Sequence, residues 1–471
     1  MAAATTDIPA GWLGNLNASQ KEKLGQFWRI LMQSWDPSIP AISSEANGNM
    51  TGPRRFFSLS RRTEPTEEEI SAIPENLLKT LKSLDANATE IKAVGSLLSQ
   101  LPGDELRAAY LTILKQDHPD ALCLRFLRAE KWNVPKAWIK FVRALNWRVN
   151  EFKVDTEVLL KGEEHNLAKS RQTENLAEKK DGEGFVLQLQ TGKGHYYGAD
   201  KWNRPICIIR VRLHNPNEQT QKGLNDYIIQ CCETARLLMV PPVDTMSIVF
   251  DLTSFSLSNW DFPPVKFIVD CFQENYPESL GAMIFYNAPW IFSSFWKIIH
   301  GILDPVVASK VHFISGAKEL EQLVPKEHII KELGGEKDWE YEYVEPAPQE
   351  NDKLKDTDTR DEILARRKTL GDELFSLTTE SILTPEAEGL KDRRDEVIKK
   401  LRENYWELDP FVRSRTILDR TGVIKPGGKI DFYPEETQTQ TQTQTQTETE
   451  PEKTSVMTDH VETKQSTTVA A

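Results

Sequence analysis

Short apolar runs alternate with helical patterns between residues 185 and 313. The runs rich in β-branched and aromatic residues are FVLQL, PICIIRV, MSIVFDL, AMIFYNA and KVHFI. Between them, apolar residues recur at spacings of three and four over residues 224–239, 263–276 and 290–303. Because strands that alternate with helices are typical of α/β domains, we expect a mainly parallel sheet within residues 180–336.

A second helical pattern precedes this domain. Apolar residues between Leu122 and Trp147 lie at helical spacing, with a break near residues 133–135. The sequence DHPD at residues 117–120 places a proline and an aspartate just before the apolar run, as at a helix start. We therefore predict two amphipathic helices in an N-terminal helical lobe that spans residues 104–155.

The two ends of the chain differ from this central part. Residues 1–103 hold the helical pattern SQKEKLGQFWRILMQSW, followed by a stretch rich in Ser, Pro, Gly and charge. Residues 337–471 hold a helical pattern near residues 386–408 and end in a Thr-Gln repeat. Such polar repeats cannot bury a core, so both extensions are expected to be partly helical and partly disordered.

Bulk composition limits the class of protein. Hydrophobic residues make up 39% of the 471 positions, which is enough for at least one sizeable core. The net charge of −13 opposes nucleic-acid binding through bulk charge. No apolar run approaches the roughly 20 residues that cross a bilayer, and the N-terminus lacks a signal-peptide layout. We therefore expect a cytoplasmic protein that meets intracellular membranes only peripherally and reversibly.

The sequence lacks the usual motifs of catalysis. It contains no G-x-S-x-G elbow, no H-E-x-x-H pair and no kinase signature, and GKGH at residues 192–195 is too short for a phosphate loop and is typical of a turn. The five cysteines lack metal-ligand spacing and are expected to be reduced and mostly buried. We expect no enzyme activity and no cofactor other than a bound lipid.

Two ionisable residues directly precede predicted strands. Glu278 lies just before AMIFYNA, and Lys310 is the first residue of the run KVHFI. If the helix between these strands is a crossover, the strands are parallel and begin at the same edge of the sheet, so the two residues become neighbours. A structural ion pair is one interpretation. The other is a lipid headgroup site, in which the carboxylate accepts hydrogen bonds from hydroxyls and the ammonium binds phosphate.

The helical pattern between these two residues is unusually apolar. At 100° per residue its apolar positions, from Ile291 to Leu303, cover an arc of about 160°, whereas an ordinary surface helix needs roughly 100°. A deeply buried crossover helix explains this arc. That is the default explanation; the alternative is a mobile lid over a lipid cavity, since Trp and Phe favour membrane interfaces.

Several motifs of this sequence resemble those of the CRAL-TRIO lipid-binding family, and more closely those of its fungal phosphatidylinositol-transfer branch. They are LRFLRAEKWNVPKAW, VFDL, the run from NYPESLG to SKVHFI, and LGG at residues 333–335. The resemblance covers residues 104–335. It implies an α/β fold with a helical N-terminal lobe, a sheet-and-helix lipid-binding domain and a gate helix at residues 290–303.

The resemblance also implies roles for individual residues. The Glu of YPE and the Lys of SK help bind the phosphatidylinositol headgroup in that family, and they fall on Glu278 and Lys310. The residues expected to form the gate and the cavity are Phe292, Phe295, Trp296, Ile299, Leu303, Val307, Met246 and Ile248.

This sequence departs from the family pattern at several positions. Glu130 stands where inositol-lipid binders often have a second arginine, and Val307 stands where they have a threonine. The positions of the phosphatidylcholine-binding hydroxyls fall on Met246 and Ile248, and that of a nearby tyrosine on Cys207. A pocket this apolar favours phosphatidylinositol together with a second ligand such as a sterol or another neutral hydrophobe.

These observations predict a protein that binds phosphatidylinositol or another hydrophobic lipid and exchanges it at a transient membrane surface. The alternative is a lipid-sensing regulatory adaptor. RRFFSLSRR at residues 54–62 suits an anionic membrane surface, although a solvated linker explains it equally. The sequence predicts no nucleic-acid partner and leaves the oligomeric state open.

Overall fold

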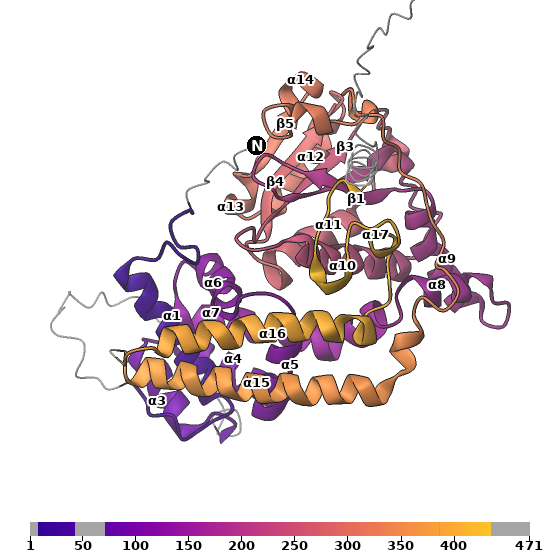
Figure 1. Ribbon diagram of the computed structural model, residues 1–471. Helices are drawn as coiled ribbons and strands as arrows, with labels where there is room; N and C mark the ends of the chain where they lie inside the picture. Colours follow the sequence, from indigo (N-terminus) through magenta and orange to yellow (C-terminus); the bar gives the residue numbers. More distant parts are fainter. Residues whose placement is uncertain (1–7, 43–70, 386, 435–471) are drawn as a thin grey trace, which may run out of the picture. The chain divides into compact units, whose positions relative to one another are not determined.

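The strands of the described chain form one five-stranded sheet in the order β1-β2-β3-β4-β5 (Figure 1). The computed structural model describes residues 8–42, 71–385 and 387–434. The strands are β1 (Gly194–Ala199), β2 (Pro205–Arg210), β3 (Met246–Asp251), β4 (Leu280–Tyr286) and β5 (Val311–Ile314). β1 is antiparallel to β2 and all other neighbours are parallel, which confirms the mainly parallel sheet.

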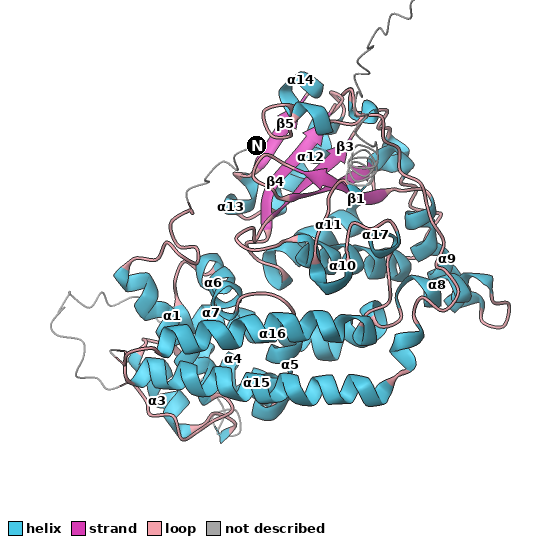
Figure 2. Ribbon diagram, viewed as in Figure 1, coloured by secondary structure: helices cyan, strands magenta, loops and turns pink. Residues whose placement is uncertain are grey.

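Each parallel pair of strands is joined by a crossover helix. These helices are α10 (Gln221–Leu238), α11 (Phe262–Asp270) and α12 (Phe292–Ile302). Two further helices, α8 (Gly162–Arg171) and α9 (Leu176–Gln190), precede the sheet, and α9 packs on α10. The resulting alternation of strand and helix is visible in Figure 2.

The run FVLQL is a helix, and its prediction as a strand was wrong. It forms the end of α9, which begins where the Asn175 side chain accepts hydrogen bonds from the amides of Ala177 and Glu178. Phe185 and Leu189 are buried together against Tyr227, so tertiary packing overrides their preference for strands. The first strand is instead β1, which begins within GKGH, so Gly192 and Lys193 form the predicted turn while Gly194 and His195 belong to the strand.

The helical lobe has its own core. It contains α1 (Ala18–Gln33), α3 (Glu75–Ser83), α4 (Ala88–Gln100), α5 (Gly103–Leu114), α6 (Pro119–Ala129) and α7 (Val134–Asn146). The two predicted amphipathic helices are α6, capped by His118, and α7, capped by Asn133. Tyr110 lies at the centre of an aromatic cluster with Trp28, Phe141 and Phe375.

Phe375 belongs to a long helical hairpin formed by α15 (Thr357–Leu383) and α16 (Leu390–Val412). The hairpin packs against α1 and α5 (Figure 1). The sequence pattern indicated only the second of these helices. The first has a weak apolar pattern because its buried stripe includes Arg367, Gly371 and Thr378. At Gly371 an added Cβ would lie 2.7 Å from the end of the Leu111 side chain on α5, so any larger residue would require Leu111 to shift.

The remaining helical elements are short. They are α13 (Pro305–Ala308), α14 (Ala317–Leu320) and α17 (Ile417–Arg420); π-helical turns at Trp147–Glu151, Val154–Leu159 and Cys271–Asn275; and 3₁₀ turns at Val211–Leu213, Leu257–Asn259, Lys326–His328, Lys331–Leu333, Asp352–Lys355 and Pro426–Gly428. In the described ranges no helix is long and apolar enough to span a membrane. The RRFFSLSRR segment and the Thr-Gln repeat lie outside the described residues.

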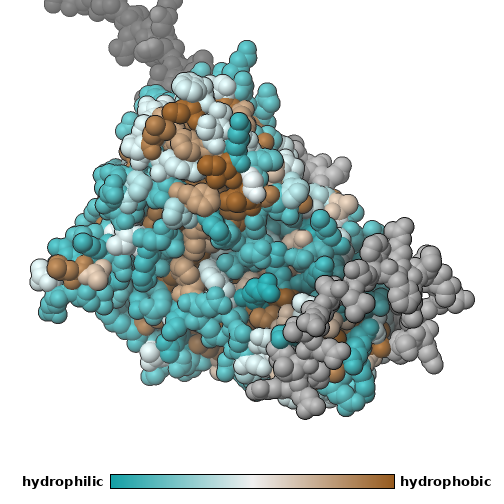
Figure 3. Space-filling model, turned by 180° about the vertical axis from the view of Figure 1, so that it is seen from behind, coloured by the Kyte–Doolittle hydropathy of each residue, from teal (hydrophilic) through white to brown (hydrophobic). Residues whose placement is uncertain are grey.

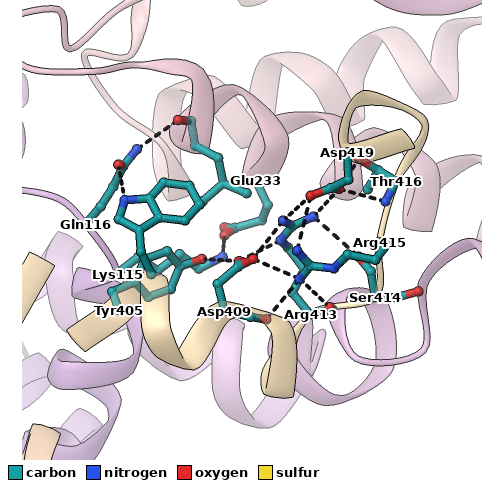
Figure 4. A network of polar contacts seen from close by, with 12 residues as sticks. Lys115, Gln116, Glu233, Tyr405, Asp409, Arg413, Ser414, Arg415, Thr416 and Asp419 are labelled. Atoms are coloured by element: carbon teal, nitrogen blue, oxygen red, sulfur yellow. Dashed lines mark hydrogen bonds and ion pairs between the residues drawn. The ribbon is translucent and has the colours of Figure 1, made fainter. Parts of the chain in front are cut away.

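A buried polar network fastens the C-terminal extension (Figure 4). Arg413 donates hydrogen bonds to both carboxylate oxygens of Asp409, at 2.7 and 2.9 Å, and of Asp419, at 2.8 Å each. Arg420 donates two bonds of 2.7 Å to Glu163 at the start of α8. Charge-assisted bonds of this length and bidentate geometry are strong, so the described part of the extension up to Phe432 is an integral part of the fold.

Candidate lipid-binding site

Glu278 and Lys310 lie together at the edge where β4 and β5 begin. The Glu278 Oε2 atom is 3.7 Å from the Lys310 Nζ atom. The Met283 amide donates to the Lys310 carbonyl, which holds the start of β5 beside β4. Glu278 has a left-handed backbone, with φ of 57°, in the turn that leads into β4. The structure therefore brings the two charges together from residues 32 positions apart in the sequence.

A second cation and a second acid complete the cluster. Arg128, in the last turn of α6, places Nε 3.8 Å from Glu278 Oε2, and its NH2 atom lies 3.4 Å from Asp244 Oδ2. Sequence analysis did not identify Arg128 or Asp244 as site residues. They are 116 positions apart. The helical lobe and the sheet meet at this point, and no local motif indicates such a contact.

The charges of this cluster are partly buried and loosely paired. Burial lowers the pKa of Lys310, and it lowers the pKa of Arg128 to about 10; in both cases Glu278 opposes the shift. The Arg128 Nε atom is buried without a hydrogen-bond partner among the described residues. All ion-pair distances in the cluster lie between 3.4 and 3.8 Å, longer than the roughly 2.7–2.9 Å of a strong charged hydrogen bond. The cluster therefore leaves hydrogen-bonding capacity that the described residues do not use.

An N-terminal segment covers one side of Arg128. The Trp12 ring lies 3.9 Å from the Arg128 guanidinium carbon, and its Nε1 donates to Asp244 Oδ1 at 3.0 Å. Arg128 also donates to the Gly11 carbonyl at 3.2 Å. Glu130, the acid at the position of the missing arginine, pairs with Lys140 at 3.0 Å. These contacts orient Arg128 toward the Glu278 carboxylate.

A narrow apolar cavity of about 180 Å³ lies between the sheet and the crossover helices. Four of the predicted gate and cavity residues line it, namely Met246, Ile248, Phe292 and Ile299. The other four, Phe295, Trp296, Leu303 and Val307, are half-buried and pack against the hydrophobic cluster that surrounds it. Cys207 also lines the cavity, beside Met246 and Ile248. The cavity wall therefore carries no hydroxyl at the three positions where the family resemblance placed phosphatidylcholine-binding groups.

The apolar arc of α12 is divided between the cavity and the surface. Phe292 and Ile299 point inward, whereas Ile298 is 49% exposed. Trp290 just before the helix is 86% exposed, and Phe313 on β5 is 49% exposed. Hydrophobic side chains gather on the sheet-bearing half of the molecule in Figure 3. A surface of this composition, with an exposed Trp and Phe, is typical of contact with a membrane interface.

Comparison with known proteins identifies the family. The CRAL/TRIO domain model matches residues 189–335, and the CRAL/TRIO N-terminal domain model matches residues 74–143. A CRAL-TRIO domain-containing protein of Schizosaccharomyces pombe is 33% identical over 88% of this chain and 93% of its own length. The chain therefore belongs to the CRAL-TRIO family of lipid-binding proteins.

Other relatives extend the comparison. The phosphatidylinositol transfer protein CSR1 of Eremothecium gossypii is 32% identical over 89% of this chain and 100% of its own length. The SEC14 cytosolic factor of the same organism is 28% identical over 58% of this chain and 86% of its own. The crystal structure of Sfh5 is similar to 53% of this chain, with 19% sequence identity and a TM-score of 0.35.

Proposed function

We propose that this protein binds phosphatidylinositol and exchanges it between membranes without covalent chemistry. The observation that carries the proposal is the loosely paired cluster of Glu278, Lys310 and Arg128. An inositol ring offers hydroxyls to the carboxylate, and its phosphate attracts the two cations. The name of the similar phosphatidylinositol transfer protein from Eremothecium gossypii supports this ligand.

The position of the cluster beside the cavity fits a two-part ligand. Val311, the residue after Lys310, is paired in register with Met283, which lines the cavity. A headgroup at Glu278 and Lys310 therefore has acyl chains within reach of the apolar space. The wall formed by Cys207, Met246 and Ile248 offers a choline phosphate no hydroxyl, so we propose that phosphatidylcholine binds weakly.

We further propose that α12 acts as the gate. A volume of 180 Å³ is below the range of roughly 300–1,000 Å³ that small-molecule pockets occupy, so lipid entry requires an opening. Phe295 stacks on Trp260 with ring centroids 4.3 Å apart, which closes α12 over the segment before α11. The exposed Trp290 and Ile298 are the side chains that a membrane would draw outward, and the protein would act peripherally and reversibly at that surface.

Vesicle transfer of labelled phosphatidylinositol tests the proposal. The double variant Glu278→Ala, Lys310→Ala is expected to lose transfer while its far-UV spectrum is unchanged. The matched control is Lys326→Ala, Glu336→Ala, an exposed pair at a similar distance of 3.6 Å, and it should transfer normally. Unchanged transfer in the first variant contradicts the proposal. So does a choline phospholipid as the main lipid that mass spectrometry identifies in protein purified from cells.

A further inference from the structure

A buried lysine lies in the wall of the otherwise apolar cavity. Lys193, in the turn between α9 and β1, lines the cavity and is 5% exposed. Its Nζ donates to the Gln219 side-chain oxygen at 3.0 Å, and it forms no ion pair with the described residues. Burial lowers its pKa to about 8, with Glu218 opposing the shift. An ammonium with three donors thus has one neutral partner at the edge of a hydrophobic space.

An unpaired acceptor lies beside this lysine. Gln188 is fully buried in the last turns of α9 and also lines the cavity. Its Nε2 donates to the Gly184 carbonyl at 2.8 Å, but its Oε1 has no hydrogen-bond partner among the described residues. Gln188 Nε2 and Lys193 Nζ both approach the Gln219 oxygen, at 3.5 and 3.0 Å, so the two side chains are neighbours. Burying such an acceptor unpaired costs stability.

The other polar groups of this wall are already paired. His214 lies within hydrogen-bond distance of Asp261, at 3.2 Å, and Asn259 donates to the carbonyls of Arg212 and His214. What remains open toward the cavity is the donor on Lys193 and the acceptor on Gln188. The remainder of the lining consists largely of apolar side chains such as Ile209, Phe250 and Leu252.

We propose that Lys193 and Gln188 bind the hydroxyl end of a neutral lipid that carries one polar group. A hydroxyl oxygen accepts a hydrogen bond from Lys193, and the hydroxyl proton is donated to Gln188 Oε1. One hydroxyl group therefore pairs both the donor and the acceptor. A carboxylate pairs only with Lys193, because it has no proton to donate and its oxygen would repel the acceptor oxygen of Gln188. A plain hydrocarbon leaves both groups buried and unpaired. This inference rests on the proposed function only in taking the cavity to be the lipid site, and Glu278 and Lys310 do not enter it.

Three pyrene-labelled probes of equal chain length test the proposal with the unmodified protein. They are a long-chain alcohol, its methyl ether and the corresponding fatty acid. The ether oxygen can still accept from Lys193, so the ether lacks only the hydrogen bond that the hydroxyl donates to Gln188 Oε1. Fluorescence titration should show that the alcohol binds roughly tenfold more tightly than the ether, the difference expected when this buried acceptor becomes paired. Equal affinity for alcohol and ether overturns the proposal. Tighter binding of the acid than of the alcohol also overturns it and assigns the wall to an anionic lipid.

Variants locate the effect. Gln188→Leu should reduce the preference for the alcohol over the ether at least threefold, because it removes the acceptor that only the alcohol can use. Lys193→Met should weaken the binding of both probes at least threefold, because it removes the donor that both oxygens can use. The exposed Lys201→Met is the matched control and should bind both probes as the unmodified protein does. An alcohol preference that survives Gln188→Leu, or unchanged binding of both probes in Lys193→Met, overturns the assignment. Phosphatidylinositol transfer is measured on the same samples. Loss of alcohol preference with intact transfer supports the inference, while failed transfer in the unmodified protein contradicts the proposed function separately.

Discussion

Two charge clusters in this protein, a buried one around Arg413 and a partly buried one around Glu278, differ in how closely their members are paired. Around Arg413 the hydrogen bonds to Asp409 and Asp419 are 2.7–2.9 Å long and bidentate. Around Glu278 the ion pairs span 3.4–3.8 Å, counting the Arg128 contact with Asp244. The first cluster satisfies its own charges, whereas the second leaves donors and acceptors for a ligand.

We propose that the difference separates a structural role from a binding role. Burial removes water from the Arg413 cluster and part of it from the Glu278 cluster, so the charges in both need compensation. In the Arg413 cluster the protein supplies this compensation from α16 and α17. In the Glu278 cluster compensation is incomplete, as the unpaired Arg128 Nε shows. Such residual cost is typical of sites where stability is traded for function.

The largest effect is expected for Arg413→Met. This change leaves the buried carboxylates of Asp409 and Asp419 with Arg415 as their remaining cation, at 2.8 and 3.2 Å. Breaking a buried pair should lower the free energy of unfolding by about 3–5 kcal/mol, measured by urea denaturation. Arg171→Met, which removes an exposed pair with Glu345, is the control and should cost less than about 1 kcal/mol. Equal losses would abolish the distinction between the clusters.

Acid should act on the same cluster. Burial alone would raise the pKa values of Asp409 and Asp419, but Arg413 outweighs burial and holds both below their usual value. Their stabilisation is therefore complete above the unfolded pKa near 3.8 and is lost as the pH falls below it. We expect the free energy of unfolding to decrease more steeply below pH 4 in the unmodified protein than in Asp419→Asn. Parallel pH profiles would contradict this assignment.

Trp12→Ala should have an intermediate effect. It removes the ring from Arg128 and the hydrogen bond to Asp244, which together are worth roughly 1–2 kcal/mol. Thermal unfolding measures this loss. The matched control is Trp202→Ala, since Trp202 lies over Arg204 at 4.7 Å but is 43% exposed and should contribute less. A larger loss in the control would show that Trp12 does not anchor Arg128.

The smallest effect on stability is expected at the binding cluster itself. Burial lowers the pKa of Lys310, so its ammonium form is the costly one in the folded protein. Lys310→Met should change the free energy of unfolding by less than about 1 kcal/mol, yet reduce phosphatidylinositol transfer at least tenfold. Lys326→Met on the surface should change neither quantity. A large loss of stability with normal transfer would make Lys310 a structural residue.

Much of the fold is encoded in local patterns. Each of the caps His118 and Asn133 is followed by apolar residues at helical spacing, and this local pattern determines α6 and α7 from sequence alone. The alternation of strands and helices predicts the parallel sheet, and the rule that parallel strands begin at one edge predicts that Glu278 and Lys310 meet. These predictions succeed because they depend on short-range periodicity and on general connection rules. The roles of the two residues stay predictions until transfer is measured.

Other features exist only in the tertiary structure. FVLQL has the composition of a strand, but contacts of α9 with α8 and α10 make it a helix. The buried face of α15 carries Arg367 and Gly371, and no hydrophobic pattern indicates that these residues are buried. Arg367 donates to a backbone carbonyl of α5, and Gly371 packs closely against Leu111 of the same helix. Arg128 meets Asp244, and Gln188 faces the cavity unpaired, through contacts between distant segments. The sequence by itself determined α6, α7, the strands β2 to β5 and the edge at which two charges meet. Only packing decided which charges stay unsatisfied, because satisfaction depends on neighbours that the chain brings together when it folds.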